Sequence, residues 1–525
     1  MESNESSLID AGPLTKQLQH ALNEMARDRV IERIWQGDYE LWSDDPTEIT
    51  EPNRLGWLDV AETMRGETSA LRRFAIDVAG DGYRKAVLFG MGGSSLGPEV
   101  LQRTLGTRPG LLELEVMDST HPDAVLDLAA RLDLQRTLFI VASKSGSTIE
   151  TLTHFEYFWS LVPDGRHFVA ITDEGSVLQK LAEERAFRQV FLNRPDIGGR
   201  YSALSYFGMV PAALIGANLD ELLSQASAMA AQCRNENVAE NPGALLGALI
   251  GEAALAGRDK LTLLLPHGLE SLGDWVEQLL AESTGKQGKG VLPVVGEPPG
   301  PAGTYGADRL FVAIGEFSDL AGFEAAGHPV VKLPLTGKQQ LGAEFFRWEF
   351  ATAVAGERLR INPFDQPNVQ SAKDATSRIL ASGITEAEAT LSISDVLATV
   401  KPGDYIAVLA YLPRNAAIEA DVQALRLDLR DRYLVATTLG FGPRYLHSTG
   451  QLHKGGPNSG VFILLTDEPM RDAEVPSRPY TFGGLHRAQA LGDLQSLVSM
   501  GRRVAHVALQ GERTAAIKAL RRGIS

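Results

Sequence analysis

The chain has a single cysteine, Cys233, among its 525 residues. One cysteine cannot form an internal disulfide, so the composition favours a reducing compartment. The N-terminus is polar and acidic, without the basic start and apolar stretch of a secretory signal, and no apolar run approaches the length of a membrane span. These absences predict a cytosolic protein that has no membrane partner.

The chain also lacks an excess of basic residues: 66 acidic against 50 basic side chains give a formal net charge of −16. Binding to a nucleic-acid backbone needs a basic stripe, so nucleic acid is not expected as a partner. No HExxH or paired CxxC spacing is present, and no metal site is predicted. The remaining composition, 44% hydrophobic and 22% charged, is typical of an enzyme with roughly two to four well-buried domains.

Apolar runs alternate with helical patterns along most of the chain. Residues 1–65 have the pattern of helices with acidic connections and are expected to cap the first core. The alternation over 66–235 is typical of a doubly wound parallel sheet, and 236–380 repeat it. Residues 381–525 add a C-terminal α/β section. We therefore predict an α/β protein with two doubly wound domains, an N-terminal helical segment and this C-terminal section.

A run of hydroxyl side chains, Ser143-Lys144-Ser145-Gly146-Ser147-Thr148, lies between a predicted buried strand at 137–142 and a predicted helix that begins at Ile149. Free backbone N–H groups, the helix dipole, hydroxyl donors and an ammonium group converge at such a turn, which favours a bound phosphoryl group. A polar loop whose hydroxyls merely cap the helix is the alternative.

A second loop of the same type, Gly90-Met91-Gly92-Gly93-Ser94-Ser95-Leu96-Gly97, follows the apolar run 85–89. Its glycines let the backbone approach a ligand closely, and Ser94 can donate a hydrogen bond. A dinucleotide site is the rival, because the loop begins a G-x-G-x-x-G and Asp118 ends the next apolar run. Ser95, however, occupies the last motif position, so nicotinamide binding is the weaker alternative.

Glu282 lies in the last turn of a predicted helix that Gly285 stops. Ser271, followed three residues later by Asp274, resembles a capping box at the start of this helix. An acid in the last turn faces the negative end of the helix dipole, which opposes its ionisation. Gln278 lies one turn earlier on the same face, so the pair can present a carboxylate and an amide to one ligand. A solvated terminal glutamate is the alternative.

The segment Asp196–Gly208, DIGGRYSALSYFG, resembles a signature of the phosphoglucose isomerase family, whose members interconvert glucose 6-phosphate and fructose 6-phosphate. Further segments resemble the family's motifs in the family's order: 90–98, 143–150, 282–286 and 362–373. In the last of these, Asn368 and Gln370 stand where glycine and glutamate are usual. The similarity covers about residues 85–375.

The resemblance implies two sugar isomerase domains with a sugar phosphate between them, acting in glycolysis and gluconeogenesis without a metal or cofactor. It implies that Glu282 moves a proton between C1 and C2 through a cis-enediol and that Arg200 stabilises the enediolate, while Lys373 assists ring opening. The residues expected to bind the substrate are Gly93, Ser94, Ser143, Lys144, Ser145, Thr148, Glu150, Gln278 and Gln366. We expect a homodimer.

The family also uses a histidine to open the pyranose ring, normally soon after the E-S-x-G-K segment and often donated by the neighbouring subunit. Residues 288–315 contain no histidine. The segment 446–451, LHSTGQ, resembles the histidine segment of shorter bacterial members, so His447 is our hypothesis, with His453 as the second choice. The C-terminal section and short N-terminus resemble the isomerase half of transaldolase–isomerase fusions.

Other functions stay open. An aminotransferring or mannose-phosphate isomerase would keep the fold and change the chemistry, although an amidotransferase needs an N-terminal cysteine nucleophile and Cys233 lies in mid-chain. A sugar-phosphate-sensing regulator would keep the phosphate loops but would have no use for Glu282 and Arg200. Such a regulator would normally carry a DNA-binding module, which neither the charge nor a helix-turn-helix pattern supports.

Overall fold

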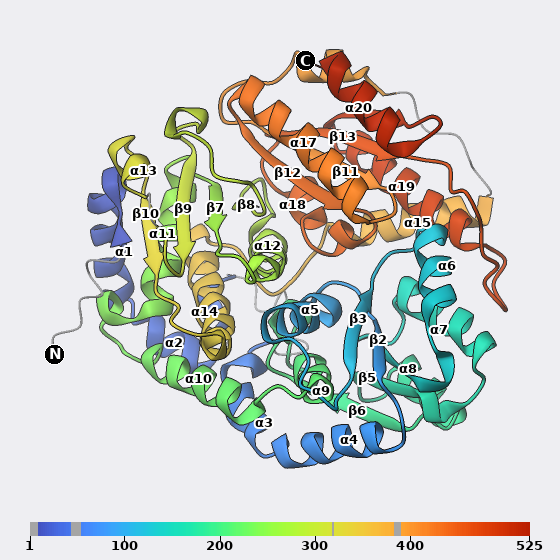
Figure 1. The fold of residues 1–525 in the computed structure, drawn as a ribbon. Helices are drawn as coiled ribbons and strands as arrows, with labels where there is room; N and C mark the ends of the chain where they lie inside the picture. Colours follow the sequence, from blue (N-terminus) through green and yellow to red (C-terminus); the bar gives the residue numbers. More distant parts are fainter. Residues whose placement is uncertain (1–8, 44–53, 318–319, 383–389, 525) are drawn as a thin grey trace.

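The computed structural model describes residues 9–43, 54–317, 320–382 and 390–524, of which the side chains of 369–374 and 382 are not described. Within these residues the strands form three sheets, each flanked by helices (Figure 1). The strand orders are β3-β2-β4-β5-β6, β1-β10-β9-β7-β8 and β12-β11-β13-β14. This arrangement confirms the predicted α/β class with two doubly wound domains and a C-terminal α/β section.

The first sheet is parallel throughout. Its strands are β2 (Lys85–Phe89), β3 (Glu113–Met117), β4 (Thr137–Ala142), β5 (Phe168–Asp173) and β6 (Gln189–Asn193). The helices between and after them are α5 (Gly93–Leu105), α6 (Pro122–Arg131), α7 (Ile149–Leu161), α8 (Val177–Glu184) and α9 (Tyr206–Ile215). The chain first runs from β2 to β3 and then returns to place β4 on the other side of β2. The carboxyl ends of β2 and β4 therefore form the switch point where doubly wound sheets bind ligands.

The second sheet contains β7 (Lys260–Leu264), β8 (Leu292–Val294), β9 (Arg309–Ile314), β10 (Val330–Leu333) and the short antiparallel β1 (Ile9–Asp10). Its helices are α10 (Leu219–Gln232), α11 (Pro242–Leu255), α12 (Glu270–Thr284), α13 (Ala321–Ala325) and α14 (Leu341–Leu359).

The C-terminal sheet contains β11 (Tyr405–Tyr411), β12 (Ala436–Phe441), β13 (Gly460–Thr466) and β14 (Arg503–Ala508). Around it lie α15 (Val369–Ser382), α16 (Ile393–Leu397), α17 (Ala416–Tyr433), α18 (Gly450–Gly455), α19 (Phe482–Ser499) and α20 (Arg513–Ile524).

The N-terminal segment packs against both domains and does not cap the first core alone. Its helices are α1 (Thr15–Arg27), α2 (Val30–Gln36) and α3 (Val60–Arg65), and α4 (Thr68–Gly80) follows in the first domain, where it packs against α9. On the side of the first domain, Leu55 forms an antiparallel bridge with Ile197, and Asp59 pairs with Arg194. On the side of the second domain, α1 packs against α11, and β1 completes the edge of the second sheet. The reason is that an edge strand offers free backbone groups, which β1 pairs with.

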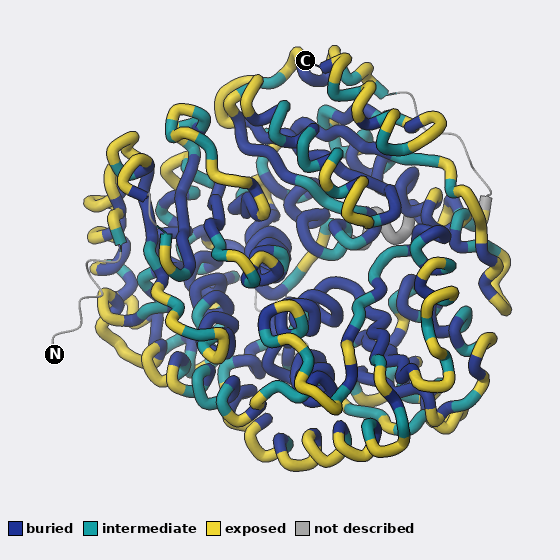
Figure 2. Tube along the Cα trace, viewed as in Figure 1, coloured by how far each residue is buried: buried dark blue, intermediate teal, exposed yellow. Residues whose placement is uncertain are grey.

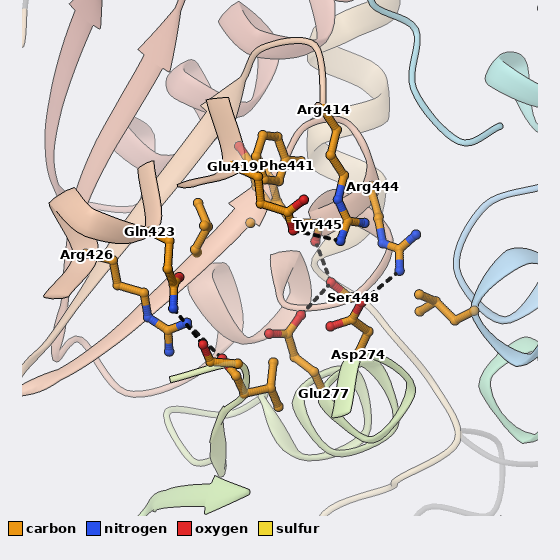
Figure 3. A pocket seen from close by; sticks show the side chains of 15 residues that line it. Asp274, Glu277, Arg414, Glu419, Gln423, Arg426, Phe441, Arg444, Tyr445 and Ser448 are labelled. Carbon is orange, nitrogen blue, oxygen red and sulfur yellow. Dashed lines mark hydrogen bonds and ion pairs between the residues drawn. The ribbon is translucent and has the colours of Figure 1, made fainter. Parts of the chain in front are cut away.

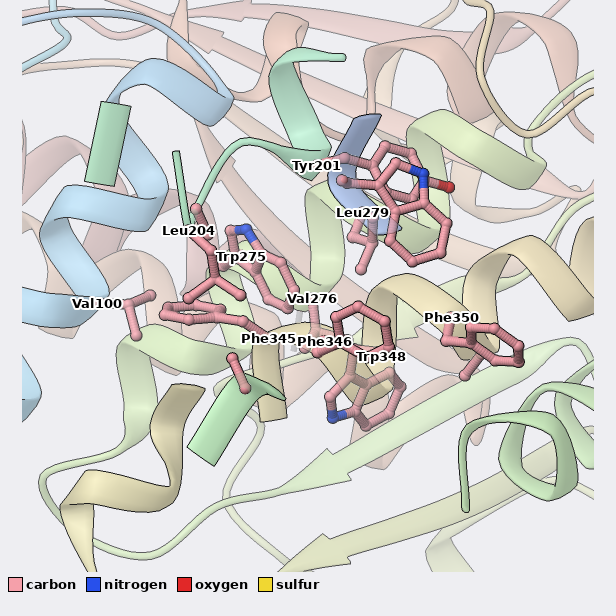
Figure 4. Packing of buried hydrophobic residues seen from close by; sticks show 14 of the residues in the cluster. Val100, Tyr201, Leu204, Trp275, Val276, Leu279, Phe345, Phe346, Trp348 and Phe350 are labelled. Atoms are coloured by element: carbon pink, nitrogen blue, oxygen red, sulfur yellow. The ribbon is translucent and has the colours of Figure 1, made fainter. Parts of the chain in front are cut away.

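Aromatic side chains fill the space between the first two domains (Figure 4). Trp275 of α12 packs edge-on against Phe345 of α14, with ring centroids 4.8 Å apart, and both are buried. Val100 of α5 and Leu204 belong to the same cluster. Figure 2 shows that α12 and central strands such as β4, β9 and β11 are buried, whereas α4 exposes one face. The core therefore fixes α12, the helix that carries Glu282, between the two domains. None of the described helices has both the length and the apolar character needed to cross a bilayer.

Replacing Trp275 with alanine is expected to lower the free energy of unfolding by about 3–5 kcal/mol, because the indole is buried and the cavity left behind cannot collapse fully. The matched control is Ile76→Ala on α4, whose side chain is 64% exposed and which should cost less than about 0.5 kcal/mol. Urea unfolding followed by fluorescence and circular dichroism measures both. Equal losses in the two variants would contradict the interpretation of this core.

Candidate active site

A cavity of about 380 Å³ lies where the first two domains and the C-terminal section meet. Ten of the thirteen predicted site residues line it, namely Gly93, Ser94, Lys144, Ser145, Thr148, Arg200, Gln278, Glu282, Gln366 and His447. Its other lining residues are Arg54, Met91, Gly92, Asp173 and Gly199. Segments far apart in the sequence thus converge on one cavity, which we call the catalytic cavity. Lys373 lies on α15, and its side chain is outside the described residues.

The two predicted phosphate loops meet at the switch point of the first sheet. Ser143 is buried beneath the catalytic cavity, where its Oγ lies 2.8 Å from Thr148 Oγ1 and accepts a hydrogen bond from Gly146 N at 3.1 Å. These bonds shape the loop before α7, so Ser145 and Thr148 face the cavity at a helix N-terminus. That geometry suits a phosphate, because backbone N–H groups and hydroxyls can all donate to it.

A glycine is required where the other phosphate loop enters α5. A Cβ atom added to Gly93 would lie 1.9 Å from the carbonyl oxygen of Gly199, a distance at which atoms overlap. Gly199 precedes Arg200, so this close approach brings the α5 N-terminus against the segment that carries the catalytic-cavity arginine. The glycine thus acts through packing as well as through access to a ligand.

Two cations lie at the phosphate loops. Lys144 Nζ pairs with Asp173 and donates to the carbonyl of Pro195 at 2.9 Å, and burial lowers the pKa of its ammonium group. Arg54 Nη1 donates to the same carbonyl at 3.0 Å. The sequence analysis missed Arg54, because it lies in the N-terminal segment outside any motif. Only the fold brings it to the cavity.

Glu282 and Arg200 form an ion pair inside the catalytic cavity. Glu282 Oε1 lies 3.6 Å from Arg200 Nη1, and both side chains are buried. Gln278 Nε2 donates to Glu282 Oε2 at 2.9 Å, so these two residues share one face of α12, as predicted from their spacing. The arrangement places a carboxylate, an amide and a guanidinium around one volume that can hold a small polar ligand.

Arg200 is held rigidly by the loop after α14. Its Nη2 donates to the carbonyls of Pro363 at 2.7 Å and Asp365 at 2.8 Å, and its Nη1 donates to Gln366 Oε1 at 2.6 Å. Nε donates to Ser283 Oγ at 2.7 Å. The guanidinium is therefore fixed in position before any ligand arrives, which is the arrangement that electrostatic catalysis needs.

Lys286, two residues after the end of α12, is a second cation that contacts this same loop. Its Nζ donates to the carbonyls of Asn362 at 2.6 Å and Asp365 at 2.7 Å, and burial lowers its pKa to about 8. The E-S-T-G-K segment thus contributes Glu282 to the cavity and Lys286 to the loop that carries Gln366. The sequence analysis gave Lys286 no role, since a contact with residues 76 or more positions away leaves no local signal.

His447 reaches the catalytic cavity from η12 (Arg444–His447) in the C-terminal section of the same chain. Its Nε2 lies 3.0 Å from Glu150 Oε1, which also accepts a hydrogen bond from Gln489 Nε2 at 2.7 Å. Glu150 is buried behind His447 rather than lining the cavity. His453 packs against Tyr405 and Phe462, and burial lowers its pKa well below the ordinary value. It does not line the cavity.

A buried arginine fixes η12. Arg444 pairs with Glu99 of α5, with Asp118 after β3 at 2.7 Å and with Asp274 of α12 at 3.1 Å. Because these carboxylates belong to the first and second domains, the contacts join the C-terminal section to both. His447, three residues further on, is positioned as a consequence.

Two doubly wound domains with a hydroxyl-rich loop and a carboxylate–arginine pair in one cavity are an arrangement that suits a phosphosugar isomerase. A family model for phosphoglucose isomerase matches residues 59–292. A glucose-6-phosphate isomerase of Rubrobacter xylanophilus is 30% identical over 366 residues, which cover 57% of this chain and 83% of that protein. A probable glucose-6-phosphate isomerase of Methanococcus maripaludis is 26% identical over 415 residues, covering 68% and 92%. The chain belongs to the phosphoglucose isomerase family.

Solved structures share this fold. The crystal structure of a hypothetical protein, TT0462, from Thermus thermophilus superposes with a TM-score of 0.60 at 25% identity, covering 71% of this chain and 99% of that chain. A glucose-6-phosphate isomerase from Chlamydia trachomatis superposes with a TM-score of 0.58 at 20% identity, covering 70% and 86%, which shows the shared fold.

The close approach at Gly93 predicts a specific defect. Gly93→Ala should destabilise the protein by about 1–3 kcal/mol, because its Cβ would overlap the Gly199 carbonyl and separate the two segments. Gly199→Ala is the matched control for stability, since a Cβ there would meet no atom within 4 Å. Thermal unfolding compares the two variants. A Gly93→Ala variant as stable as Gly199→Ala would show that this contact is not required.

Proposed function

We propose that this isomerase interconverts glucose 6-phosphate and fructose 6-phosphate through a cis-enediol, with Glu282 as the base. The observation that supports this most is the buried Glu282 carboxylate 3.6 Å from a fixed guanidinium, in the same cavity as a hydroxyl-rich phosphate loop. A sensor of sugar phosphates would need the loop alone. The carboxylate–guanidinium pair instead suits a reaction in which a proton is moved and a negative charge develops.

The chemistry follows from the positions of these groups. With the phosphate held by Lys144, Ser145 and Thr148, the open-chain sugar extends into the cavity. Glu282 accepts the proton on C2 of the aldose, the electron pair forms the C1–C2 double bond, and the C1 carbonyl oxygen gains negative charge. Arg200 stabilises that charge. The proton of the C2 hydroxyl passes to the C1 oxygen, and the same carboxyl returns its proton to C1 as the C2 carbonyl forms. The net result is aldose to ketose with no loss of atoms.

Gln278 and Gln366 orient the reacting groups. Gln278 holds Glu282 Oε2 by its hydrogen bond, which leaves Oε1 for the substrate on the side of Arg200. Gln366 accepts from Arg200 and lines the cavity, where its amide N–H can bind a sugar hydroxyl. Gly93 and Ser94 supply the α5 N-terminus to the same ligand. These roles stay predictions until binding is measured.

His447 is proposed to open the pyranose ring. When its Nε2–H donates to Glu150, Nδ1 is the nitrogen left to exchange a proton with the sugar. Glu150, which was predicted to hold a sugar hydroxyl, would then act by fixing the tautomer of His447. Lys373 keeps its predicted part in ring opening. The expected homodimer also stays a prediction, although one chain supplies His447 to its own cavity.

The variant Glu282→Gln should lower kcat for fructose 6-phosphate by at least about 100-fold, because an amide cannot accept the C2 or C1 proton. KM should change only a few-fold, since the phosphate loops are untouched. The conversion is followed by coupling glucose 6-phosphate formation to NADP reduction. Glu270→Gln, an exposed change at the other end of α12, is the matched control. Full activity in Glu282→Gln would rule out this base.

The variant His447→Ala should lose about 100-fold in kcat/KM for cyclic glucose 6-phosphate. It should react normally with a tetrose 4-phosphate, which lacks the ring-closing hydroxyl and needs no ring opening. Glu150→Gln should shift the pH profile for the cyclic substrate alone, and the exposed His267→Ala serves as control. If His447→Ala treated cyclic and open-chain substrates alike, the histidine would have no ring-opening role.

A further inference from the structure

A second cavity, of about 300 Å³, lies against the catalytic cavity and is called the rear cavity here. Figure 3 shows its walls: Asp274 and Glu277 from α12, and Arg414, Arg426, Arg444 and Ser448 from the C-terminal section. It opens at the carboxyl ends of β11 and β12, the edge at which open α/β sheets bind ligands. Nothing in the proposed reaction uses this space.

The two cavities share their walls at two places. Glu277 lines the rear cavity, and the next residue, Gln278, lines the catalytic cavity. Ser448 lines the rear cavity, and the preceding residue, His447, lines the catalytic cavity. Ser448 Oγ donates to Glu277 Oε1 at 3.3 Å, so one hydrogen bond links the two shared walls. A ligand in the rear cavity would therefore contact α12 and the 447–448 segment on the side away from the catalytic cavity.

The rear cavity contains guanidinium groups, and one of them has donors to spare. Arg426 donates to the carbonyls of Val295 and Thr437, while Arg444 is engaged by its carboxylates. Arg414 Nη2 donates to Glu419 at 3.2 Å and, among the described residues, makes no other hydrogen bond. Its guanidinium lies 5.7 Å from the centre of the Phe441 ring. Arg414 can therefore still bind an anion in the fork geometry that guanidinium favours.

The acidic side chains around the rear cavity neutralise two of its three guanidinium groups, those of Arg426 and Arg444. Burial raises the pKa of Glu277 to about 8, which favours its neutral carboxyl form, and in that form its hydroxyl can donate a hydrogen bond to a ligand. Asp274 is already paired with Arg444. Glu99 and Asp118 also pair with Arg444, and Glu297 lies 3.9 Å from Arg426. Arg414, whose one ion-pair partner among the described residues is Glu419, is therefore the guanidinium left to bind an anion. Its remaining donors and the polar interior of the cavity can together hold one small anion.

We propose that the rear cavity is an effector site for a small metabolite bearing a phosphate or carboxylate group, held by Arg414. An anion that accepts a hydrogen bond from the Glu277 carboxyl would reorganise the Glu277–Ser448 contact and so shift His447. A bound anion would therefore change the turnover rate of the enzyme in addition to occupying the rear cavity. The effect on turnover rests on the proposed isomerase function, whereas binding does not.

Binding is tested by thermal unfolding of the full chain with inorganic phosphate, using sodium chloride of equal ionic strength as reference. The variants are Lys144→Gln, which weakens the catalytic phosphate site, Arg414→Gln, and both together. We expect Lys144→Gln to keep a phosphate-dependent rise in melting temperature that Arg414→Gln removes in that background. Arg471→Gln, an exposed arginine of the same section, should behave as wild type. An equal rise with and without Arg414 would overturn the proposal.

Two further measurements identify the type of ligand and separate the charge of Arg414 from its geometry. Succinate replaces phosphate to distinguish the ligand types: a rise that depends on Arg414 with succinate assigns carboxylates, and one with phosphate alone assigns phosphate esters. Arg414→Lys keeps the charge but loses the fork, so it should retain only part of the rise, and it serves if Arg414→Gln fails to fold.

Kinetics test the regulatory part. Phosphate in the catalytic cavity competes with substrate and raises KM alone, whereas phosphate in the rear cavity should also change kcat. Arg414→Gln should abolish the change in kcat and keep the increase in KM. A kcat that is independent of phosphate in the wild type would overturn the regulatory part. Absence of isomerase activity in the wild-type chain would contradict the proposed function. The unfolding experiment would still show whether the rear cavity binds an anion.

Discussion

The contacts of the buried Arg444 guanidinium hold the three parts of the chain in register. Its partners Glu99, Asp118 and Asp274 come from α5, the end of β3 and α12, while Arg444 itself belongs to the C-terminal section. A buried ion pair gains little net stability, because desolvation offsets the attraction, but removing one partner leaves uncompensated charges and is costly. Its value here is positional, since it sets η12, and with it His447, against the catalytic cavity.

A second set of buried cations fixes the substrate side of the same cavity. Arg200 and Lys286 both donate to backbone carbonyls of the 362–366 loop, and Arg200 also pairs with Glu282. Glu282, Arg200 and Gln366 are thereby tied into one rigid unit at the α12 C-terminus. Such preorganisation means that little rearrangement is needed when charge develops on the substrate. The sites at α12 and η12 are therefore coupled through packing rather than through flexible loops.

The sequence pattern predicted those parts of the site that depend on neighbouring residues in the chain, namely the strand-to-helix loops and the face of a helix. The two phosphate loops follow β2 and β4, and the helical period places Gln278 and Glu282 on one face. The predicted capping box was wrong: α12 begins at Glu270, and the Ser271 hydroxyl is buried with no hydrogen-bond partner among the described residues. Arg54 and the contacts of Glu150 depend on tertiary packing, which no local pattern encodes.

The acidic chain must still bind a phosphorylated anion, and the geometry shows how. The net charge of −16 acts mainly through solvent, where salt screens it over roughly 8–10 Å. Lys144, Arg54 and Arg200 line the catalytic cavity, and the N-termini of α5 and α7 lie at it, so these groups would lie close to an anion bound there. Coulomb energy varies inversely with distance and with the local dielectric constant, so these near groups outweigh the distant acids. The global charge then governs the rate of encounter, while the local donors govern affinity.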